Sequence, residues 1–205
     1  MRYLLILLLI VVLSNNAMAQ HTSLDDQTLI ELMEHRGHEH TELEQFLSNS
    51  TNYLSLAIPL SILAHGTIRG DKITLQKGLY IGESIVVSSL ITYALKTTIN
   101  RDRPFKRNSF IIPEGAAGSP SFPSGHTSQA FSTATSLSIA FPKWYVIAPA
   151  FTWASAVGYS RMYLGVHYPS DVIGGAIVGA GSAWLTYKAN QWLQGKHKHH
   201  TIATY

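Results

Sequence analysis

The sequence predicts an all-α protein, a bundle of about five to six helices in a single domain. Apolar segments of helical length follow one another along most of the 205 residues, and no alternating pattern typical of a β-strand is sustained. The last apolar segment is rich in Gly and Ala, which let neighbouring helices pack closely. No shift in composition marks a second folded domain.

The first stretch has the features of a secretory signal peptide. Arg2 precedes an apolar run over residues 3–13, and an Ala-Met-Ala sequence typical of a cleavage site ends at residue 19. We expect residues 1–19 to be a cleaved signal peptide, with an uncleaved anchor helix as the alternative. Both interpretations predict a protein that is exported or inserted into the cell envelope.

Residues 20–50 are expected to form an amphipathic N-terminal segment. Ser23 and Asp26 have the spacing of a capping box, and apolar residues then recur at helical spacing until Gly37 interrupts the pattern. The segment also contains three histidines that could bind a metal, although a charged, solvated surface is the simpler interpretation: His35, His38 and His40.

A helical domain is expected over residues 51–193, followed by a basic, His-rich tail over residues 194–205. The loop at 100–123 is rich in Pro, Gly and Ser, and loops of that length inside compact domains are usually functional or disordered. The predicted helices of the domain are residues 52–66, 78–99, 125–141, 144–162 and 170–193.

The charge pattern favours a membrane-embedded domain over a soluble periplasmic one. Each apolar run falls slightly short of the ~20 residues that cross a bilayer, so hydropathy alone does not decide. Five crossings that start outside would put the basic segments on the inner side, as the positive-inside rule requires. These segments hold Arg69, Lys72, Lys77, Lys143, Lys196 and Lys198. Residues 100–124 and 160–171 would then meet on the outer side.

Composition argues against several other classes of function. Cysteine is absent, so the chain has no disulfide, thiol nucleophile or thiolate metal site. The net charge is +3 with only 13% charged residues, and these are too scattered for a basic nucleic-acid-binding face. We therefore expect no nucleic-acid partner.

Two cations precede the long loop. Lys96 and Arg103 are seven residues apart, about two helical turns, so both can leave one helix face before Pro104 ends the helix. Such a pair repels itself unless an anion lies between its members. A solvated basic helix end is the alternative interpretation.

A second cluster lies where the next helix is expected to begin. Ser124 is a favoured N-cap, Gly125 lets a ligand approach the backbone, and the free N–H groups of the first turn form an anion cradle. His126 follows in that turn, where an imidazole can donate a proton. A helix-start histidine without a catalytic role is the alternative.

A third cluster surrounds the start of the last helix. Pro169 is tolerated in a first helical turn, so His167 should lie just before the helix and Asp171 in its first turn. The carboxylate would orient the imidazole and leave its other nitrogen free as a nucleophile or base. Arg161, at the end of the preceding helix, adds a planar fork that suits phosphate oxygens. Together the clusters suit a tetrahedral oxyanion and phosphoryl transfer.

The three clusters match a known three-part signature. Residues 96–104 fit KxxxxxxRP, residues 123–126 fit PSGH, and residues 160–171 fit SRxxxxxHxxxD. In these motifs the chain resembles the type 2 phosphatidic acid phosphatase and vanadium haloperoxidase superfamily, in its membrane-associated phosphatase branch.

The resemblance implies a metal-independent phosphatase on a helical bundle, without a cofactor. His167 would attack phosphorus to form a phosphohistidine, Asp171 would orient it, and His126 would protonate the leaving oxygen and then activate water. The implied phosphate-binding residues are Lys96, Arg103, Ser124, Gly125 and Arg161. The expected substrate is a lipid phosphate, such as phosphatidate, phosphatidylglycerophosphate, undecaprenyl pyrophosphate or a lipid A phosphate, on the outer side of an inner membrane.

Three alternatives stay open. A soluble periplasmic non-specific acid phosphatase would use the same residues on small phosphate esters. A vanadate-dependent haloperoxidase would hold vanadate in the same pocket. A non-enzymatic envelope protein could bind metal through its histidine-rich stretches at residues 35–40 and 197–200, but this explains none of the three motifs.

Overall fold

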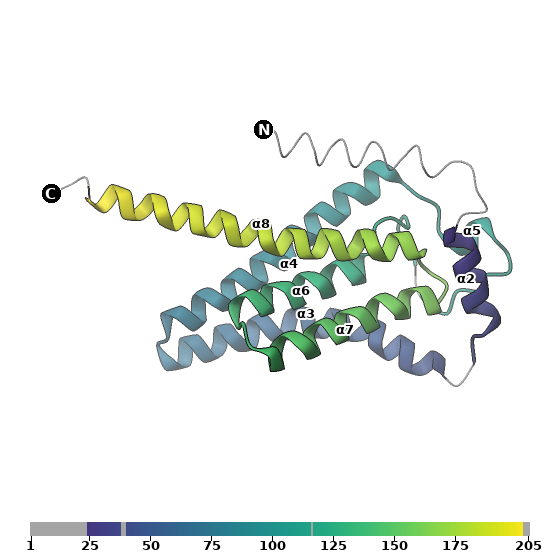
Figure 1. Ribbon diagram of the computed structural model, residues 1–205, viewed down its shortest axis with the longest axis horizontal. Helices are drawn as coiled ribbons and strands as arrows, with labels where there is room; N and C mark the ends of the chain where they lie inside the picture. Colours follow the sequence, from purple (N-terminus) through teal and green to yellow (C-terminus); the bar gives the residue numbers. More distant parts are fainter. Residues whose placement is uncertain (1–23, 38–39, 116, 203–205) are drawn as a thin grey trace.

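The computed structural model describes residues 24–37, 40–115 and 117–202, which form seven helices and no strand (Figure 1). The predicted all-α class is confirmed. The predicted signal peptide, Ser23 and His38 lie outside the described residues. The helices are α2 (Leu24–Glu34), α3 (Thr41–Arg69), α4 (Lys72–Ile99), α5 (Pro104–Arg107), α6 (Gly125–Ala140), α7 (Trp144–Tyr163) and α8 (Pro169–Ile202).

Helix α3 is longer than the apolar pattern predicted. It begins at Thr41, so the expected boundary between residues 50 and 51 lies inside one helix. The first turns are polar, and the sequence pattern therefore missed them, but Ser48 and Thr51 are buried. Helix α3 ends where Gly70 adopts a left-handed conformation with φ of 65°. Asp71 then caps α4, its Oδ1 accepting hydrogen bonds from the first turn.

The helical pattern is interrupted near Gly37, as predicted. Most ends of the last three predicted helices agree with the structure to within a few residues. Helix α8 is the exception, because its backbone stays helical through Ile202 and so includes most of the expected tail. The predicted loop at 100–123 contains one short helix, α5, which starts at Pro104.

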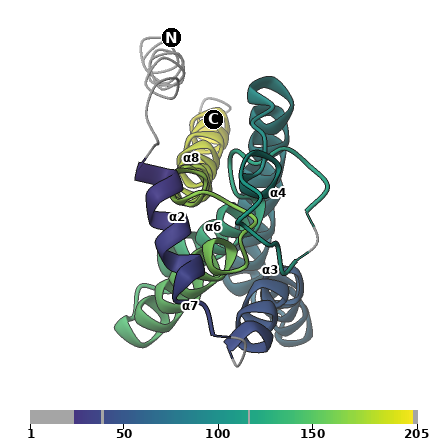
Figure 2. The ribbon, with the colours of Figure 1, turned by 90° about the vertical axis from the view of Figure 1, so that its right-hand side faces the viewer.

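Helix α6 lies at the centre of the bundle, in contact with α3, α4, α7 and α8 (Figure 2). Its buried positions are mostly Ala, Ser and Thr, and their hydroxyls are used between helices. Ser128 Oγ lies 2.6 Å from Ser88 Oγ on α4 and 2.7 Å from Thr92 Oγ1. Small residues therefore let the central helix pack on all sides without leaving these polar groups unpaired.

Helices α6 and α8 pack closely against each other, as the Gly-rich sequence predicted. A Cβ atom on Gly179 would lie 2.2 Å from the carbonyl oxygen of Ser128, and one on Gly175 would lie 2.6 Å from that of Ser124. Neither position has room for a side chain. The contact holds the start of α8 against the start of α6, and both starts carry predicted site residues.

The outer faces of the long helices are apolar. One segment of the described chain, Lys72–Arg107, is long and apolar enough to cross a membrane by length and composition. A core helix of a soluble protein can pass the same test, but these outer faces carry many exposed large apolar side chains. Examples are Leu56, Leu60, Val86, Leu90, Ile173 and Ile177.

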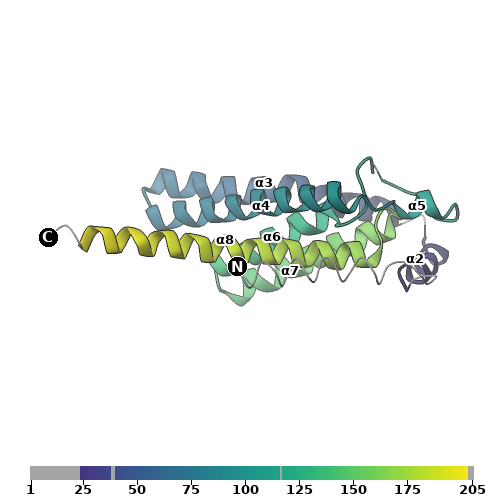
Figure 3. The same ribbon diagram turned by 90° about the horizontal axis from the view of Figure 1, so that it is seen from above.

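All three predicted motifs lie at one end of the bundle. Figure 1 shows the α4–α5 and α7–α8 connections at the end where α2 also lies, and the α3–α4 and α6–α7 turns away from it. Helix α8 continues past the other helices at that opposite end (Figure 3). The topology thus brings residues 96–104, 123–126 and 160–171 together.

Candidate active site

The first two predicted cations meet, but by a different route from the one the spacing predicted. Helix α4 ends at Ile99, because Asn100 adopts a left-handed conformation with φ of 48°. Arg103 is extended, at the N-cap of α5, as expected for a residue that precedes a proline. The prediction that Lys96 and Arg103 leave one helix face was therefore wrong. A turn of the chain, not helical periodicity, brings their charges together.

Backbone carbonyls of the long loop hold both cations in place. Lys96 Nζ donates to the carbonyl oxygen of Pro120 at 2.5 Å, and Arg103 Nε donates to that of Ser119 at 2.8 Å. Arg103 Nη1 also donates to the carbonyl of Val166 at 2.8 Å. Arg103 is buried and Lys96 partly buried, so an anion that reaches them meets charges already withdrawn from water.

The start of α6 contacts the start of α8 and lies beside Lys96 of α4. Ser124 occupies the N-cap position as predicted, but its side chain does not cap the helix; its Oγ instead accepts a hydrogen bond from Thr127 Oγ1 at 2.8 Å. Its backbone N–H donates to the carbonyl of Asp171 at 2.9 Å. A Cβ on Gly125 would lie 3.9 Å from Lys96 Cε. The predicted anion cradle therefore opens beside a cation.

His167 is held between a carboxylate and a guanidinium. Its Nδ1 lies 3.4 Å from Asp171 Oδ2, and its Nε2 lies 3.2 Å from Arg103 Nη1. Because Arg103 can only donate, Nε2 carries the lone pair and Nδ1 carries the proton. The tautomer required of a nucleophilic imidazole is thereby fixed by two neighbours.

Burial keeps this imidazole uncharged. His167 is only 1% exposed, and burial lowers its pKa from 6.5 to about 3, with Asp171 opposing the shift and Arg103 adding to it. The ring lies in the connection between α7 and α8 and is neutral at any ordinary pH. A neutral imidazole has a lone pair available for attack.

Asp171 is fully buried and accepts several hydrogen bonds. Its Oδ2 also accepts from Ser121 Oγ at 2.5 Å and from the backbone N–H of Tyr168 at 2.9 Å. Its Oδ1 accepts from Arg101 Nη1 at 2.7 Å. With these donors the carboxylate stays ionised inside the protein and its orientation is fixed.

Arg161 is buried at the end of α7 and retains donor capacity. Its Nη1 donates to Ser48 Oγ on α3, and its Nε is buried with no hydrogen-bond partner among the described residues. His126, in the first turn of α6, lies in the electrostatic field of Arg161, Arg103 and Lys96. All three cations therefore act on the space beside this second histidine.

The fold thus brings together all eight residues that the motifs predicted, and adds three that the motifs did not. Arg101 lies within the first motif and Ser121 just before the second. The polar residues that gather at the ends of the long loop could have marked both as candidates. Ser48 is far away in sequence, and only the packing of α3 against α7 places it on Arg161.

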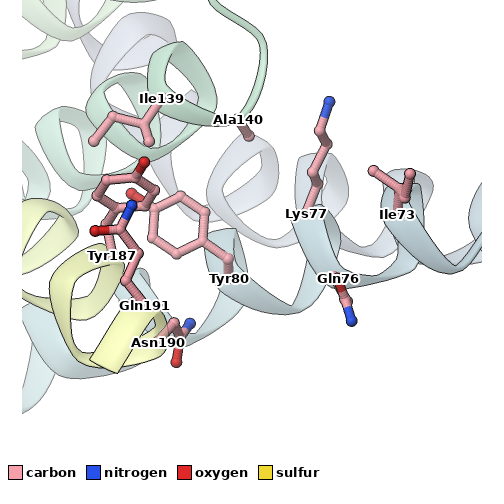
Figure 4. Close-up of a pocket in the computed structure, with 9 residues that line it drawn as sticks. All are labelled: Ile73, Gln76, Lys77, Tyr80, Ile139, Ala140, Tyr187, Asn190 and Gln191. Atoms are coloured by element: carbon pink, nitrogen blue, oxygen red, sulfur yellow. The ribbon is translucent and has the colours of Figure 1, made fainter. Parts of the chain in front are cut away.

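A cavity of about 220 Å³ lies at the other end of the bundle, between α4, α6 and α8 (Figure 4). Tyr80, Tyr187 and Lys77 are among its lining residues. Lys77 precedes Lys96 by 19 residues on α4, or about 28 Å of helix, so this cavity is not part of the motif site. Among the described residues, no group of His, Asp and Glu side chains is placed to hold a metal ion.

Comparison with known proteins gives one matching family and several relatives. The model of the PAP2 superfamily matches residues 77–194. A lipid A 4'-phosphatase of Bacteroides thetaiotaomicron is 35% identical over 88 residues, 43% of this chain and 39% of the relative. A lipid A 1-phosphatase of Rhizobium etli is 35% identical over 114 residues, 53% of this chain and 48% of the relative. The chain thus spans less than half the length of these two relatives.

Other matches cover most of both chains. The undecaprenyl-diphosphatase BcrC of Bacillus subtilis is 28% identical over 159 residues, 77% of this chain and 80% of the relative. The structure of a transmembrane PAP2 type phosphatidylglycerolphosphate phosphatase from Bacillus subtilis has a TM-score of 0.72 at 25% identity, covering 90% of this chain and 94% of that one. LpxE of Aquifex aeolicus also has a TM-score of 0.72, at 24% identity, covering 81% and 96%, and shares the fold.

Proposed function

The chain belongs to the PAP2 superfamily, and on that premise we propose that it is a membrane phosphatase that hydrolyses a lipid phosphate through a phosphohistidine intermediate. The observation that carries the proposal is the position of His167, with Nδ1 facing Asp171 and Nε2 facing Arg103. The lone pair of Nε2 faces Arg103, and a phosphate that binds this guanidinium would lie in front of the lone pair.

In the first step, His167 Nε2 attacks phosphorus as the bond to the leaving oxygen breaks. The substrate phosphate displaces the contact between Arg103 and Nε2, and Arg103 then donates to a phosphate oxygen instead. Positive charge that develops on the imidazole is balanced by Asp171 through the Nδ1 proton. The negative charge of the bound phosphate offsets the three cations that disfavour a charged His126, so that His126 is protonated in the complex. It then gives this proton to the leaving oxygen, and a neutral alcohol or a protonated phosphate departs.

In the second step, water hydrolyses the phosphohistidine. His126, now without its proton, accepts one from the water as the oxygen attacks phosphorus, and the bond between Nε2 and phosphorus breaks. Inorganic phosphate is released and both histidines return to their starting forms. No redox change occurs and no further reactant is needed.

Positioned charge supplies the rest of the catalysis. Lys96, Arg103 and Arg161 would bind the three non-bridging oxygens, together with the first-turn N–H groups that follow Ser124 and Gly125. Their charges are fixed before the reaction, so little reorganisation is needed when the transition state forms. This arrangement gives a role to each of the eight predicted site residues.

The proposed location is the cell envelope, with the helices of residues 41–193 in the membrane and the active site on its outer side. The apolar outer faces of α3, α4 and α8 and the basic turns at the end away from the site support it. Relatives named for lipid A and undecaprenyl diphosphate support a lipid phosphate as substrate. The resemblance to the phosphatidylglycerolphosphate phosphatase structure points the same way.

The test is phosphate release by the purified, detergent-solubilised protein. The substrate panel contains phosphatidate, phosphatidylglycerophosphate, undecaprenyl pyrophosphate, lipid A and a soluble phosphate ester. We expect turnover of at least one lipid, lost by at least about 10³-fold in His167→Ala. His65→Ala is the matched control, because that histidine is exposed on α3, and it should retain full activity.

Other outcomes would favour the other interpretations. Extraction without detergent, together with equal turnover of every ester, would indicate a soluble non-specific acid phosphatase. Peroxidase activity with added vanadate and no phosphate release would indicate a haloperoxidase. Full phosphatase activity in His167→Ala would refute the mechanism itself.

A further inference from the structure

An acidic residue of α2 lies at the active-site end of the bundle, although α2 is outside the segment that matches the family model. Asp25 lies in the first turn of α2, more than fifty residues before the matched region begins at residue 77. Its Oδ2 lies 2.9 Å from Arg101 Nη2, and both side chains are mostly buried, with exposed fractions of 12% and 13%. The contact is therefore shielded from solvent.

Arg101 connects this carboxylate to Asp171. Its Nη2 donates to Asp25, while its Nη1 donates to Asp171 Oδ1 at 2.7 Å. The guanidinium also lies 4.0 Å from the centre of the Tyr168 ring. Burial alone would lower the pKa of Arg101, but Asp171 and Asp25 together raise it, so the charge is secure. Arg101 is thus fixed in one orientation by two anions and a ring.

Asp25 also holds the start of α8, the helix that carries Asp171. Its Oδ1 accepts the backbone N–H of Ser170 at 2.9 Å, and its Oδ2 accepts the hydroxyl of the same residue. Ser170 is in the first turn of α8, where backbone N–H groups have no partner within the helix. A carboxylate at this place acts as the N-terminal cap of α8, supplied by a different helix.

We infer that Asp25 and Arg101 are positioning residues of the active site, completing a chain of contacts from α2 through Arg101 and Asp171 to His167. The inference rests on the proposed function of His167 as the nucleophile. Neither residue touches the phosphate; both act through Asp171.

The chain of contacts has a definite electrostatic consequence. Asp171 must be anionic enough to balance an imidazolium, yet it must be held still. Arg101 binds its Oδ1, while its Oδ2 accepts from Ser121 and Tyr168 and faces the imidazole. Asp25 shares the charge of Arg101, so that the guanidinium does not neutralise Asp171 fully. Removing Asp25 lets Arg101 neutralise more of the charge of Asp171, and removing Arg101 releases Asp171 from its fixed orientation. Either change weakens the support that Asp171 gives to His167 in the transition state, without changing the groups that bind phosphate.

The test is a double-mutant cycle on turnover of the best substrate. Asp25→Asn keeps the shape and the amide oxygen that can accept from Ser170, but loses the charge. We expect kcat to fall about 10-fold in Asp25→Asn and about 10–100-fold in Arg101→Met, with KM changed less than about twofold, because bonds to charged groups are lost behind the nucleophile. The double variant should be no slower than Arg101→Met alone.

Two controls separate positioning from a structural role. Glu31→Gln removes the same charge from an exposed position of α2 and should leave kcat unchanged. Arg101→Lys keeps the charge but cannot bind both carboxylates in a fork, so it should recover only part of the loss. If Asp25→Asn fails to fold, the comparison of Arg101→Lys with Arg101→Met carries the test. Losses that multiply in the double variant, or a change in KM alone, would overturn the inference.

A spectroscopic readout keeps the inference separate from the proposed function. The NMR signal of the His167 Nδ1 proton reports the strength of its bond to Asp171 whether or not any substrate is hydrolysed. It should move upfield in Asp25→Asn and Arg101→Met and stay in place in Glu31→Gln. An unchanged signal in both variants would overturn the inference, even if the wild-type protein is an active phosphatase. A shifted signal in an inactive protein would refute only the proposed function.

Discussion

The contact between α6 and α8 makes a quantitative prediction for Gly179→Ala. The new Cβ would lie 2.2 Å from the carbonyl oxygen of Ser128 and 2.8 Å from the amide nitrogen of Ser132, both of them backbone atoms that cannot rotate away. Contacts of this kind are ordinarily 3.4 Å or more. Helix α8 must therefore retreat from α6 by about 1 Å.

The energetic cost follows from the geometry. Overpacking of a filled core costs about 1–3 kcal/mol, while Ala in place of Gly in a helix returns up to about 1 kcal/mol. The net loss should be about 1–2 kcal/mol, and the thermal midpoint should fall by about 2–8 °C for a chain of this size. Activity should fall as well, because the same movement lengthens the 2.9 Å hydrogen bond from Ser124 to the carbonyl of Asp171.

Gly181→Ala is the matched control on the same helix. No atom lies within 4 Å of a Cβ at that position, so this variant should gain stability by up to about 1 kcal/mol and keep full activity. The assay is thermal unfolding in detergent, with phosphate release measured on the same samples. If Gly179→Ala melts at or above the temperature of Gly181→Ala, the two helices are not as close as the argument requires.

Three further predictions concern the site. Ser121→Ala removes the 2.5 Å donor to Asp171, so kcat should fall about 10-fold or more. Ser109→Ala, in the exposed part of the same loop, should have no effect. Ser48→Ala removes a partner that holds the buried Arg161, so inhibition by inorganic phosphate should weaken several-fold if Arg161 binds phosphate as proposed. Ser61→Ala, at an exposed position of α3, should not change the inhibition constant, and equal constants in both variants would contradict this. Because burial lowers the pKa of His167 to about 3, the unfolded chain takes up a proton there below pH 6.5 and the folded protein does not. The free energy of unfolding should therefore fall by about 1.4 kcal/mol per pH unit between pH 6.5 and about 3, and His167→Gln, measured in denaturant, should lack this contribution.

Much of the fold could be predicted from the sequence because its signals are local. Apolar runs at helical spacing predicted the main helices, and the Gly-rich run predicted the close packing of α8, which Gly175 and Gly179 explain. The start of α3 could not be predicted in this way. Its polar residues, such as Ser48, are buried against another helix, and no local pattern distinguishes a buried serine from a solvated one.

The residues of the candidate site could likewise be predicted only where the sequence carries a local motif. Motif spacing predicted eight candidate residues that the fold brings together, but it gave the wrong geometry for Lys96 and Arg103, since Asn100 ends α4 before a second turn can align them. Asp25 could not be found at all. Two long helices, α3 and α4, lie between it and Arg101 in the sequence, and only tertiary packing makes it a neighbour of the site.

The most direct test of His167 as the nucleophile is to trap the phosphorylated enzyme. The purified protein is mixed with a substrate radiolabelled in the phosphate, quenched within the first turnover, and digested for peptide analysis. We expect an acid-labile, alkali-stable label on the peptide that contains His167, with no label in His167→Ala. Multiple turnovers with no label on any histidine, or a label on His126 in place of His167, would contradict it.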